Sequence, residues 1–221
     1  MPIDSSIRAE ILAQLSALGA SSPILRSPAS IHKLYEVYVA TCMMRALREK
    51  GAHLVPKDTH GVTTHDLRFR MAPGLIYSPA SSPGYVLVSY EGQEFELHTD
   101  LRVLGKSGIL HELDVCLIDR TQAQHCRGGN VDPPASSVAA FLEVKYHGVP
   151  IPLHEGREYL GLSSEFTIRP KAFVCNLDNS DIQILLASHK GTVHFGPTPL
   201  NPRSTQELVS WLGTEISHQL A

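Results

Sequence analysis

The apolar positions near the N-terminus recur with the spacing of a helix. One helical face is formed by Ile7, Ile11, Leu15 and Leu18. The Gly- and Pro-containing residues that follow interrupt this pattern, so an N-terminal helix and loop are expected over residues 1–28. A longer helix is predicted over residues 30–50, which start with a Ser, contain good helix formers and a basic last turn, and are followed by a Gly.

Between residues 53 and 108 the pattern changes to short runs typical of strands. The runs are "LRFRM", "GLIYS", "YVLVSY" and "FELHTDLRVL", and "EGQE" predicts a hairpin turn between the last two. Residues 109–119, "ILHELDVCLID", are nearly continuously apolar except for acids, which predicts a central strand covered on both faces. Residues 120–138 are polar and rich in Gly, Pro and Ser, so an exposed loop is expected there.

The second half of the chain alternates strands and helices. The strand "AAFLEVKYH" is followed by a predicted helix at 153–165, the strand "KAFVCNL", a helix with Ser180 as its N-cap and the short strand "VHFG". A C-terminal helix over 204–221 opens with Ser204 and Glu207 in the spacing of a capping box. This order predicts a single α/β domain with a mixed sheet flanked by helices, whose core spans residues 30–197.

Composition agrees with one domain and limits its partners. A chain of 221 residues with 43% hydrophobic content can bury one sizeable core. The formal net charge of −3 gives no global attraction to nucleic acid or to an anionic membrane. A polyanionic partner would therefore have to meet a local patch.

The cysteines and the N-terminus indicate the setting. Cys42, Cys116, Cys126 and Cys175 are scattered without a CxxC pair, so neither disulfides nor zinc are expected. The neighbouring His125 and Cys126 lack a matching second pair. No apolar run is long enough to span a bilayer, and the N-terminus has an early acid and no basic flank. A reducing, cytoplasmic setting without membrane contact is expected.

Two predicted strands carry acids and a lysine among apolar residues. Side chains alternate along a strand, so Glu143 and Lys145 share a face in "FLEVKYH", as Glu112 and Asp114 do in "HELDV". If these strands pair antiparallel with Asp114 opposite Glu143, several carboxylates meet in an otherwise apolar strand pair. Glu112 would then lie opposite Lys145. The repulsion calls for a cation, and Mg²⁺ or Mn²⁺ prefers such oxygen ligands, with the Val144 backbone carbonyl as a further candidate.

In this arrangement Lys145 would lie beside an attacking water or a scissile phosphate. An ammonium there orients the water and stabilises the negative charge that develops on the phosphate, which is the chemistry of phosphodiester hydrolysis. A simpler alternative remains open: Glu112 or Glu143 forms a cross-strand ion pair with Lys145, and Asp114 caps a turn.

Glu36 is a further acid with an unusual place. It shares a helical stripe that looks core-facing with Val39, Ala40, Met43 and Leu47. A carboxylate on such a stripe needs a partner. Either Glu36 pairs with Lys33 or His32 at the solvent edge of the stripe, or it reaches the metal site.

The set Glu36, Asp114, Glu143 and Lys145 resembles the PD-(D/E)XK nuclease superfamily, which has the restriction-endonuclease-like fold and includes type II restriction enzymes and Holliday junction resolvases. The resemblance covers residues 30–197. It implies an αβββαβ core around a mixed sheet, with Asp114 and Glu143 as metal ligands, Lys145 as the catalytic lysine and Glu36 as the auxiliary acid of the first core helix. Leu113 replaces the proline of the family pattern.

The resemblance implies an endonuclease that uses Mg²⁺ or Mn²⁺ to hydrolyse DNA, of a prokaryotic defence or restriction type. A homodimer is expected because cutting both strands of a duplex calls for two sites, and a recruiting or activating protein partner is left open. Two alternatives stand beside it: a catalytically inactive nucleic-acid-binding or scaffolding module of the same fold, and an RNA-directed nuclease.

Other polar residues are candidates for contact with the substrate. Arg68 and Arg70 share a face of a predicted strand and could contact phosphate. His147, directly after the strand that carries Lys145, is a weaker candidate. Arg157 and Glu158 on the following helix either line the site or form a solvated helix face.

Overall fold

The structure, a computed structural model, describes residues 3–22, 29–168 and 170–220. Its strands form one seven-stranded sheet in their order along the chain. The strands are β1 (His53–Lys57), β2 (Tyr85–Tyr90), β3 (Gln93–Leu104), β4 (Leu110–Asp119), β5 (Val138–Lys145), β6 (Lys171–Cys175) and β7 (Val193–Phe195). Neighbours pair antiparallel from β1 to β5 and parallel from β5 to β7. The sheet is therefore mixed, as predicted.

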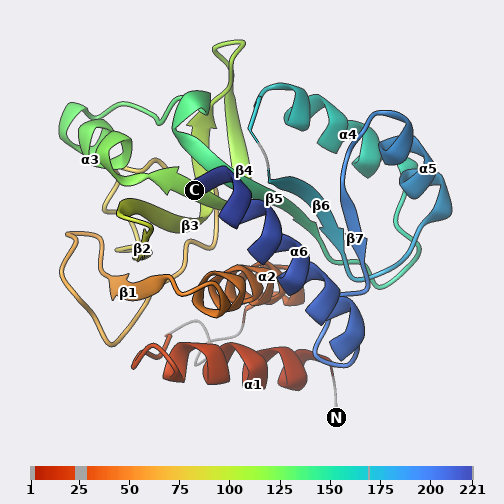
Figure 1. The fold of residues 1–221 in the computed structure, drawn as a ribbon, viewed down its shortest axis with the longest axis horizontal. Helices are drawn as coiled ribbons and strands as arrows, with labels where there is room; N and C mark the ends of the chain where they lie inside the picture. The colour runs from red at the N-terminus through yellow and green to blue at the C-terminus, as the bar shows by residue number, and fades with distance from the viewer. Residues whose placement is uncertain (1–2, 23–28, 169, 221) are drawn as a thin grey trace.

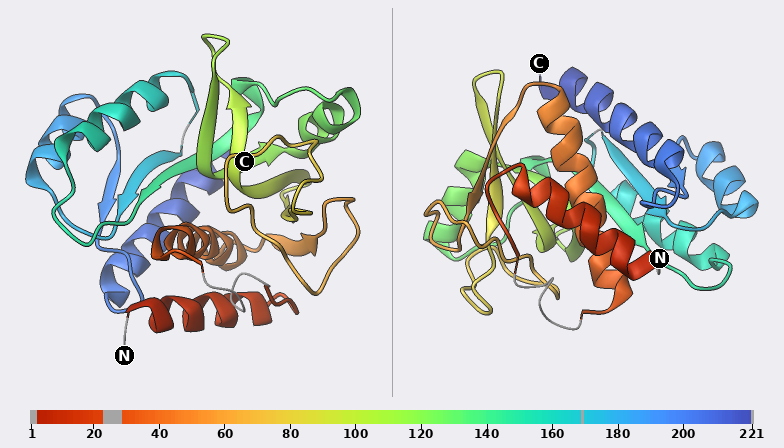
Figure 2. Two further views of the ribbon diagram at one scale, coloured as in Figure 1. Left: turned by 180° about the vertical axis from the view of Figure 1, so that it is seen from behind. Right: turned by 90° about the horizontal axis from the view of Figure 1, so that it is seen from below.

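Helices cover both faces of this sheet (Figures 1 and 2). The described helices are α1 (Ile3–Ser16), α2 (Ile31–Glu49), α3 (Arg120–Gly129), α4 (Leu153–Ser164), α5 (Ser180–Ser188) and α6 (Pro202–Leu220). Apolar residues of α1, α2 and α6 pack with one face of the sheet, and those of α3, α4 and α5 pack with the other. In β5, Leu142 and Val144 belong to the first of these clusters and Phe141 to the second, as strand alternation requires. The α/β layered architecture is confirmed.

Helix α2 is the central helix of its layer and matches its prediction. Ser30 caps its N-terminus by accepting a hydrogen bond from the Lys33 N–H. Gly51, just beyond its C-terminus, has a φ of 89°, a conformation that costs glycine little. Because α2 lies against the sheet and is buried along most of its length, side chains of its first turns face the strands.

The region between β1 and β2 corrects two predictions. The runs "LRFRM" and "GLIYS" are not strands, and β1 was not among the predicted runs. Proline cannot donate to a strand ladder, and Pro73, Pro79 and Pro83 interrupt this region. Its backbone meets the sheet at Gly74, which donates to the Asp100 carbonyl and accepts from the Arg102 N–H.

The polar segment after β4 corrects a third prediction, because its first half is helix α3 rather than a loop. The Asp119 carboxylate accepts a hydrogen bond from the Gln122 N–H and caps the helix. Only Ala123 and Cys126 are buried, so the sequence contains almost no apolar periodicity to indicate the helix. The rest of the segment includes a short 3₁₀ turn at Ala135–Ser137.

Two predicted helix starts shift by a few residues. The N-cap of α5 is Asn179 rather than Ser180. Helix α6 begins at Pro202, and the Asn201 carboxamide accepts from the Ser204 N–H, so the supposed capping box lies inside the helix. The loop predicted after α1 falls partly on residues 23–28, outside the described residues. No helix in the described part of the chain is long and apolar enough to cross a membrane.

Candidate functional site

The pairing of β4 with β5 brings Asp114 close to Glu143 and Lys145. The register pairs Val115 with Leu142, so Asp114 and Glu143 are the next residues along, as predicted. The Val144 N–H donates to Asp114 Oδ2 over 2.7 Å. Lys145 Nζ lies 2.7 Å from Glu143 Oε1 and 4.0 Å from Asp114 Oδ2. The Glu143–Lys145 ion pair of the simpler alternative is thus present, but it runs along β5 rather than across two strands, and Asp114 lies inside β4 rather than capping a turn.

Strand β3 adds an acid that the sequence interpretation missed. Thr99 pairs with Val115 and Leu101 with Leu113, so Asp100 lies between these pairs, opposite Asp114. Asp100 is fully buried and has a φ of 49°. Residues four positions apart in a regular strand share a face, but Leu97 and Leu101 pack in different apolar clusters, because the left-handed Asp100 breaks the alternation.

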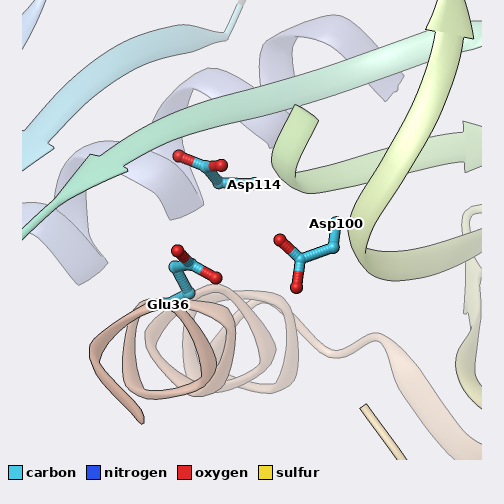
Figure 3. A group of neighbouring side chains, drawn as sticks. All are labelled: Glu36, Asp100 and Asp114. Atoms are coloured by element: carbon cyan, nitrogen blue, oxygen red, sulfur yellow. The ribbon is translucent and has the colours of Figure 1, made fainter. Parts of the chain in front are cut away.

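Glu36 completes a group of three carboxylates. Figure 3 shows Glu36 from α2, Asp100 and Asp114 with their carboxyl groups turned toward one another. One carboxylate oxygen from each lies within 4.8 Å of the others. Glu36 is 9% exposed, meets these acids and also pairs over 2.7 Å with Lys33, one of the two partners that the solvent-edge interpretation named. Glu143 does not belong to this group of three.

The acidic side chains outnumber the lysines between them. We call Glu36, Asp100, Glu112, Asp114 and Glu143, with Lys33 and Lys145, the acidic cluster. Burial and the nearby Asp100 and Asp114 raise the pKa of Glu36 to about 8. Burial and Asp114 raise the pKa of Glu143 to about 7, and burial and a hydrogen bond with Asp100 do the same for Glu112. These carboxylates are therefore poorly compensated by the protein's own cations.

The pKa values of the two lysines are also raised, but by the neighbouring carboxylates and against the effect of burial. Burial alone would lower the pKa of Lys145, but Glu143 and Asp114 raise it above its ordinary value. Burial would likewise lower the pKa of Lys33, and its contacts with Asp100 and Glu36 raise it. Both ammonium groups therefore remain charged at neutral pH.

A small cavity opens at the end of β5 beside the acidic cluster. It measures about 240 Å³ and is lined by His32, Glu36, Val144, Lys145, Tyr146, His147 and Glu155. His147 Nε2 lies 3.5 Å from Glu155 Oε1, and the His147 N–H donates to Asn176 Oδ1. Tyr146 packs edge-on against Tyr35, as expected of a strand-end aromatic residue. Of the predicted substrate contacts, His147 is thus the one that lines this cavity.

The predicted arginine pair separates in the structure. Arg68 and Arg70 do not share a strand face, because no strand forms there. Arg68 is exposed, whereas Arg70 is 8% exposed, its guanidinium hydrogen-bonds His98 and the Leu75 carbonyl, and burial lowers its pKa to about 10. Arg157 and Glu158 are exposed on α4, as a solvated helix face requires.

Arg70 belongs to a second buried polar group, which we call the balanced cluster: Arg70, Glu96, His98 and Arg127. Glu96 accepts hydrogen bonds from both terminal nitrogens of Arg127 and lies 2.9 Å from His98 Nε2. His98 Nδ1 lies 3.1 Å from Arg70. Burial lowers the pKa of His98 to about 4, so the ring is neutral and can donate to Glu96 while accepting from Arg70. Each side chain in this cluster has its partners.

The donor chemistry of the acidic cluster suits a hard cation. Its available ligand atoms are carboxylate oxygens, the kind that Mg²⁺ and Mn²⁺ prefer. Within the described residues, Asp100 Oδ2 is buried without a hydrogen-bond donor, and Glu36 Oε2 is paired with the Lys33 ammonium over 2.7 Å. A scan against protein-family models and a search of curated proteins both found no match. The interpretation of this cluster therefore depends on its geometry and charge.

Proposed function

We propose that this protein is an endonuclease that hydrolyses phosphodiester bonds in DNA with a divalent cation, and that its fold is the restriction-endonuclease-like fold of the PD-(D/E)XK superfamily. The observation that carries the proposal is the β4–β5 register, which puts Asp114 beside Glu143 and Lys145. The element order supports it when β1, β2 and α3 are treated as additions: α2, the antiparallel strands β3 to β5, α4 and the parallel strand β6 then follow the order αβββαβ.

Asp114 and Glu143 would hold the ion, which is Mg²⁺ or Mn²⁺. Both are carboxylates that burial leaves poorly solvated, with raised pKa values, and a cation would relieve their mutual repulsion. The N–H of Val144 already points at Asp114, and the C=O of a strand residue points to the same neighbouring strand as its N–H. The Val144 carbonyl is thus a suitable further ligand.

The bound cation would supply charge that stabilises the phosphate as it gains negative charge. The chain's own residues then position the reactants. Lys145 Nζ, 28% exposed at the side chain and lining the cavity, would orient the attacking water and donate a hydrogen bond to a phosphate oxygen. His147, in the wall of the same cavity, would contact the backbone next to the cleaved bond. Glu36 serves as the auxiliary acid.

The proposal extends to the oligomeric state of the protein, its partners and its cellular role. Duplex cutting by two sites calls for a homodimer, and Arg68 offers an exposed charge for phosphate contact. The net charge of −3 favours delivery of the substrate by a recruiting or activating protein partner. A prokaryotic defence or restriction-type role and a cytoplasmic setting complete the hypothesis.

The test is incubation of plasmid and linear duplex DNA with the protein and Mg²⁺, beside Asp114→Ala, Lys145→Ala and the control Arg157→Ala. Wild type and the control should cleave, and EDTA, Asp114→Ala and Lys145→Ala should abolish cleavage. Activity that survives in Asp114→Ala or Lys145→Ala would contradict the site assignment.

Parallel reactions on RNA decide between the alternatives. Cleavage of RNA with no cleavage of single- or double-stranded DNA would replace the proposal by an RNA-directed nuclease. An inactive module of the same fold predicts no cleavage and no uptake of divalent ions. Mn²⁺ uptake that Glu143→Gln abolishes or weakens would count against that module.

A further inference from the structure

Arg70 is a buried arginine without a carboxylate partner of its own. Its Nη1 donates to His98 Nδ1 over 3.1 Å and its Nη2 to the Leu75 carbonyl over 3.4 Å, and both acceptors are neutral. Glu96, the carboxylate of the balanced cluster, is paired with Arg127 instead. Within the described residues Arg70 forms no ion pair. Its hydrogen bonds therefore fix the guanidinium group in place, but no carboxylate in contact cancels its charge.

The Arg70 side chain lines a cavity of about 410 Å³ between β3 and the segment before β2, which we call the arginine cavity. Arg102, exposed on β3, brings a second guanidinium group to it. Arg102 acts on the pKa of Asp132 but forms no ion pair with it. A Cβ at Gly74 would lie 3.0 Å from Arg70 Cδ and Nε, so the glycine makes room for the arginine. The cavity thus brings together two guanidinium groups that lack carboxylate partners.

The other walls of the arginine cavity are apolar or carry hydroxyl groups. Phe69, Leu75 and Pro83 supply apolar surface, and Ser78 and Ser81 supply hydroxyl groups. Two guanidinium groups suit a phosphate, because their N–H forks match its oxygens and their two positive charges match a dianion. The aromatic ring suits a flat base, since every base has a face that can stack on it. A volume of about 410 Å³ is at the lower end of the range for small-molecule sites, which fits one nucleotide.

We propose that the arginine cavity binds a nucleotide, with its phosphate at Arg70 and Arg102 and its base against Phe69. A free nucleotide and one nucleotide of a single strand offer the same chemistry, and binding measurements distinguish these two sources. The site is independent of the proposed function, because none of the three residues belongs to the acidic cluster and no divalent ion is needed. Of the arginine pair predicted from the sequence, Arg70 thus keeps a phosphate contact, and Arg102 takes the place of Arg68.

Calorimetric titration of the full-length protein in EDTA tests this site. EDTA removes divalent ions, so the acidic cluster cannot bind a phosphate through a metal. The probes are 2′-deoxyadenosine 5′-monophosphate, deoxyadenosine, inorganic phosphate and a short single strand of deoxyadenosine nucleotides. The variants are Arg102→Met, Arg70→Met and the control Arg157→Met, which removes an exposed arginine outside the cavity. Because Arg102 is exposed, its replacement should keep the fold even if the loss of the buried Arg70 does not.

Wild type should bind the monophosphate, and deoxyadenosine and inorganic phosphate should each bind about tenfold more weakly or worse, because each lacks one part of the contacts. Arg102→Met and folded Arg70→Met should weaken binding of the monophosphate by about tenfold or more, since each loses charge-assisted hydrogen bonds. Arg157→Met should match wild type.

Tighter binding of the monophosphate than of the strand would identify a free nucleotide as the ligand, and the reverse order would identify a nucleotide within a strand. The site would be overturned if wild type bound neither probe, or if Arg102→Met or folded Arg70→Met kept the affinity of wild type. A protein that binds the monophosphate in EDTA but cleaves no DNA with Mg²⁺ would retain this site and lose only the proposed function.

Discussion

Strand β3 carries residues of two buried polar clusters that differ in charge balance. In the balanced cluster, Glu96 meets Arg127 and a neutral His98, and burial is compensated by hydrogen bonds, which lower the pKa of Glu96. In the acidic cluster, Asp100 lies next to other carboxylates, and burial raises their pKa values. A buried polar group with complete partners stabilises the fold, whereas a surplus of buried carboxylates is relieved by bound protons or by a bound cation.

The comparison predicts opposite effects of mutation in the two clusters. The largest effect is expected for Asp114→Asn and Glu143→Gln, which should reduce Mg²⁺-dependent DNA cleavage by about 10²- to 10³-fold or more, the scale seen when a group that stabilises transition-state charge is lost. Their free energy of unfolding should stay level or rise, because each removes one like charge from a crowded site. Cleavage rates test the predicted loss of activity, and urea denaturation tests the predicted stability. Wild-type cleavage in either variant would contradict the predicted loss of activity.

In the balanced cluster, Arg127→Met should destabilise the fold by about 3 kcal/mol, because Glu96 is left buried with a charge and too few donors. Mn²⁺ affinity should not change. The matched control is Arg120→Met on the same helix, whose partner Glu94 is half exposed, and its cost should stay below about 1 kcal/mol. Equal destabilisation by the two variants would show that the balanced cluster has no special role.

The two clusters should also differ in how their contributions to stability depend on pH. Glu36, Glu112 and Glu143 have folded-state pKa values of about 8, 7 and 7, above their ordinary value of 4.5. Between about pH 4.5 and pH 8 the folded protein therefore holds more protons than the unfolded chain. Its free energy of unfolding falls as the pH rises through this window. His98, with a folded-state pKa of about 4, acts in the opposite sense only below the ordinary histidine pKa of 6.5.

Thermal unfolding at pH 7 and pH 9 measures the contribution of the three glutamates, because His98 acts only below pH 6.5. In EDTA the melting temperature should be lower at pH 9 than at pH 7. Mg²⁺ at about a hundred times its dissociation constant should raise the free energy of unfolding by about 2.7 kcal/mol. At equal Mg²⁺ concentration, the rise in melting temperature should be larger at pH 9 than at pH 7. A melting temperature that rises between pH 7 and pH 9 in EDTA would mean that the acidic cluster is already compensated.

The smallest effect is expected on the exposed face of α4. Arg157→Ala should change stability by less than about 0.5 kcal/mol and leave DNA cleavage unchanged, because the side chain is exposed and lies outside both clusters. Parallel denaturation and cleavage assays measure this. A tenfold loss of cleavage would instead place this helix face against the substrate.

Much of this architecture could be predicted from the sequence, because apolar periodicity is strong in α2, β4, β5 and α6. The β4–β5 register was predicted by placing the acids of the two strands opposite each other. The observed pairing of Val115 with Leu142 confirms this register. Helix α3 was missed because only Ala123 and Cys126 face the core. The strands predicted near Arg70 were wrong, because prolines prevent a strand ladder there although the local composition is strand-like.

The candidate site was predicted only in part. Glu36, Asp114, Glu143 and Lys145 were identified from their places on apolar strands and a helix face, and Lys33 was named as a partner of Glu36. Asp100 and its contact with Lys33 were not predicted. A signal for Asp100 existed: the hairpin around "GKSG", where Gly105 N donates to Ile109 O, places Asp100 opposite Asp114. The left-handed backbone at Asp100 had no such signal, since it depends on how two long strands bend.

The acidic cluster is expected to bind divalent cations, and the balanced cluster is not. The most direct test is a calorimetric titration of Mn²⁺ into wild type, Asp114→Asn and Glu96→Gln, each verified as folded. Wild type and Glu96→Gln should bind Mn²⁺, and Asp114→Asn should lose this binding. Binding that persists unchanged in Asp114→Asn, or that disappears in folded Glu96→Gln, would contradict it.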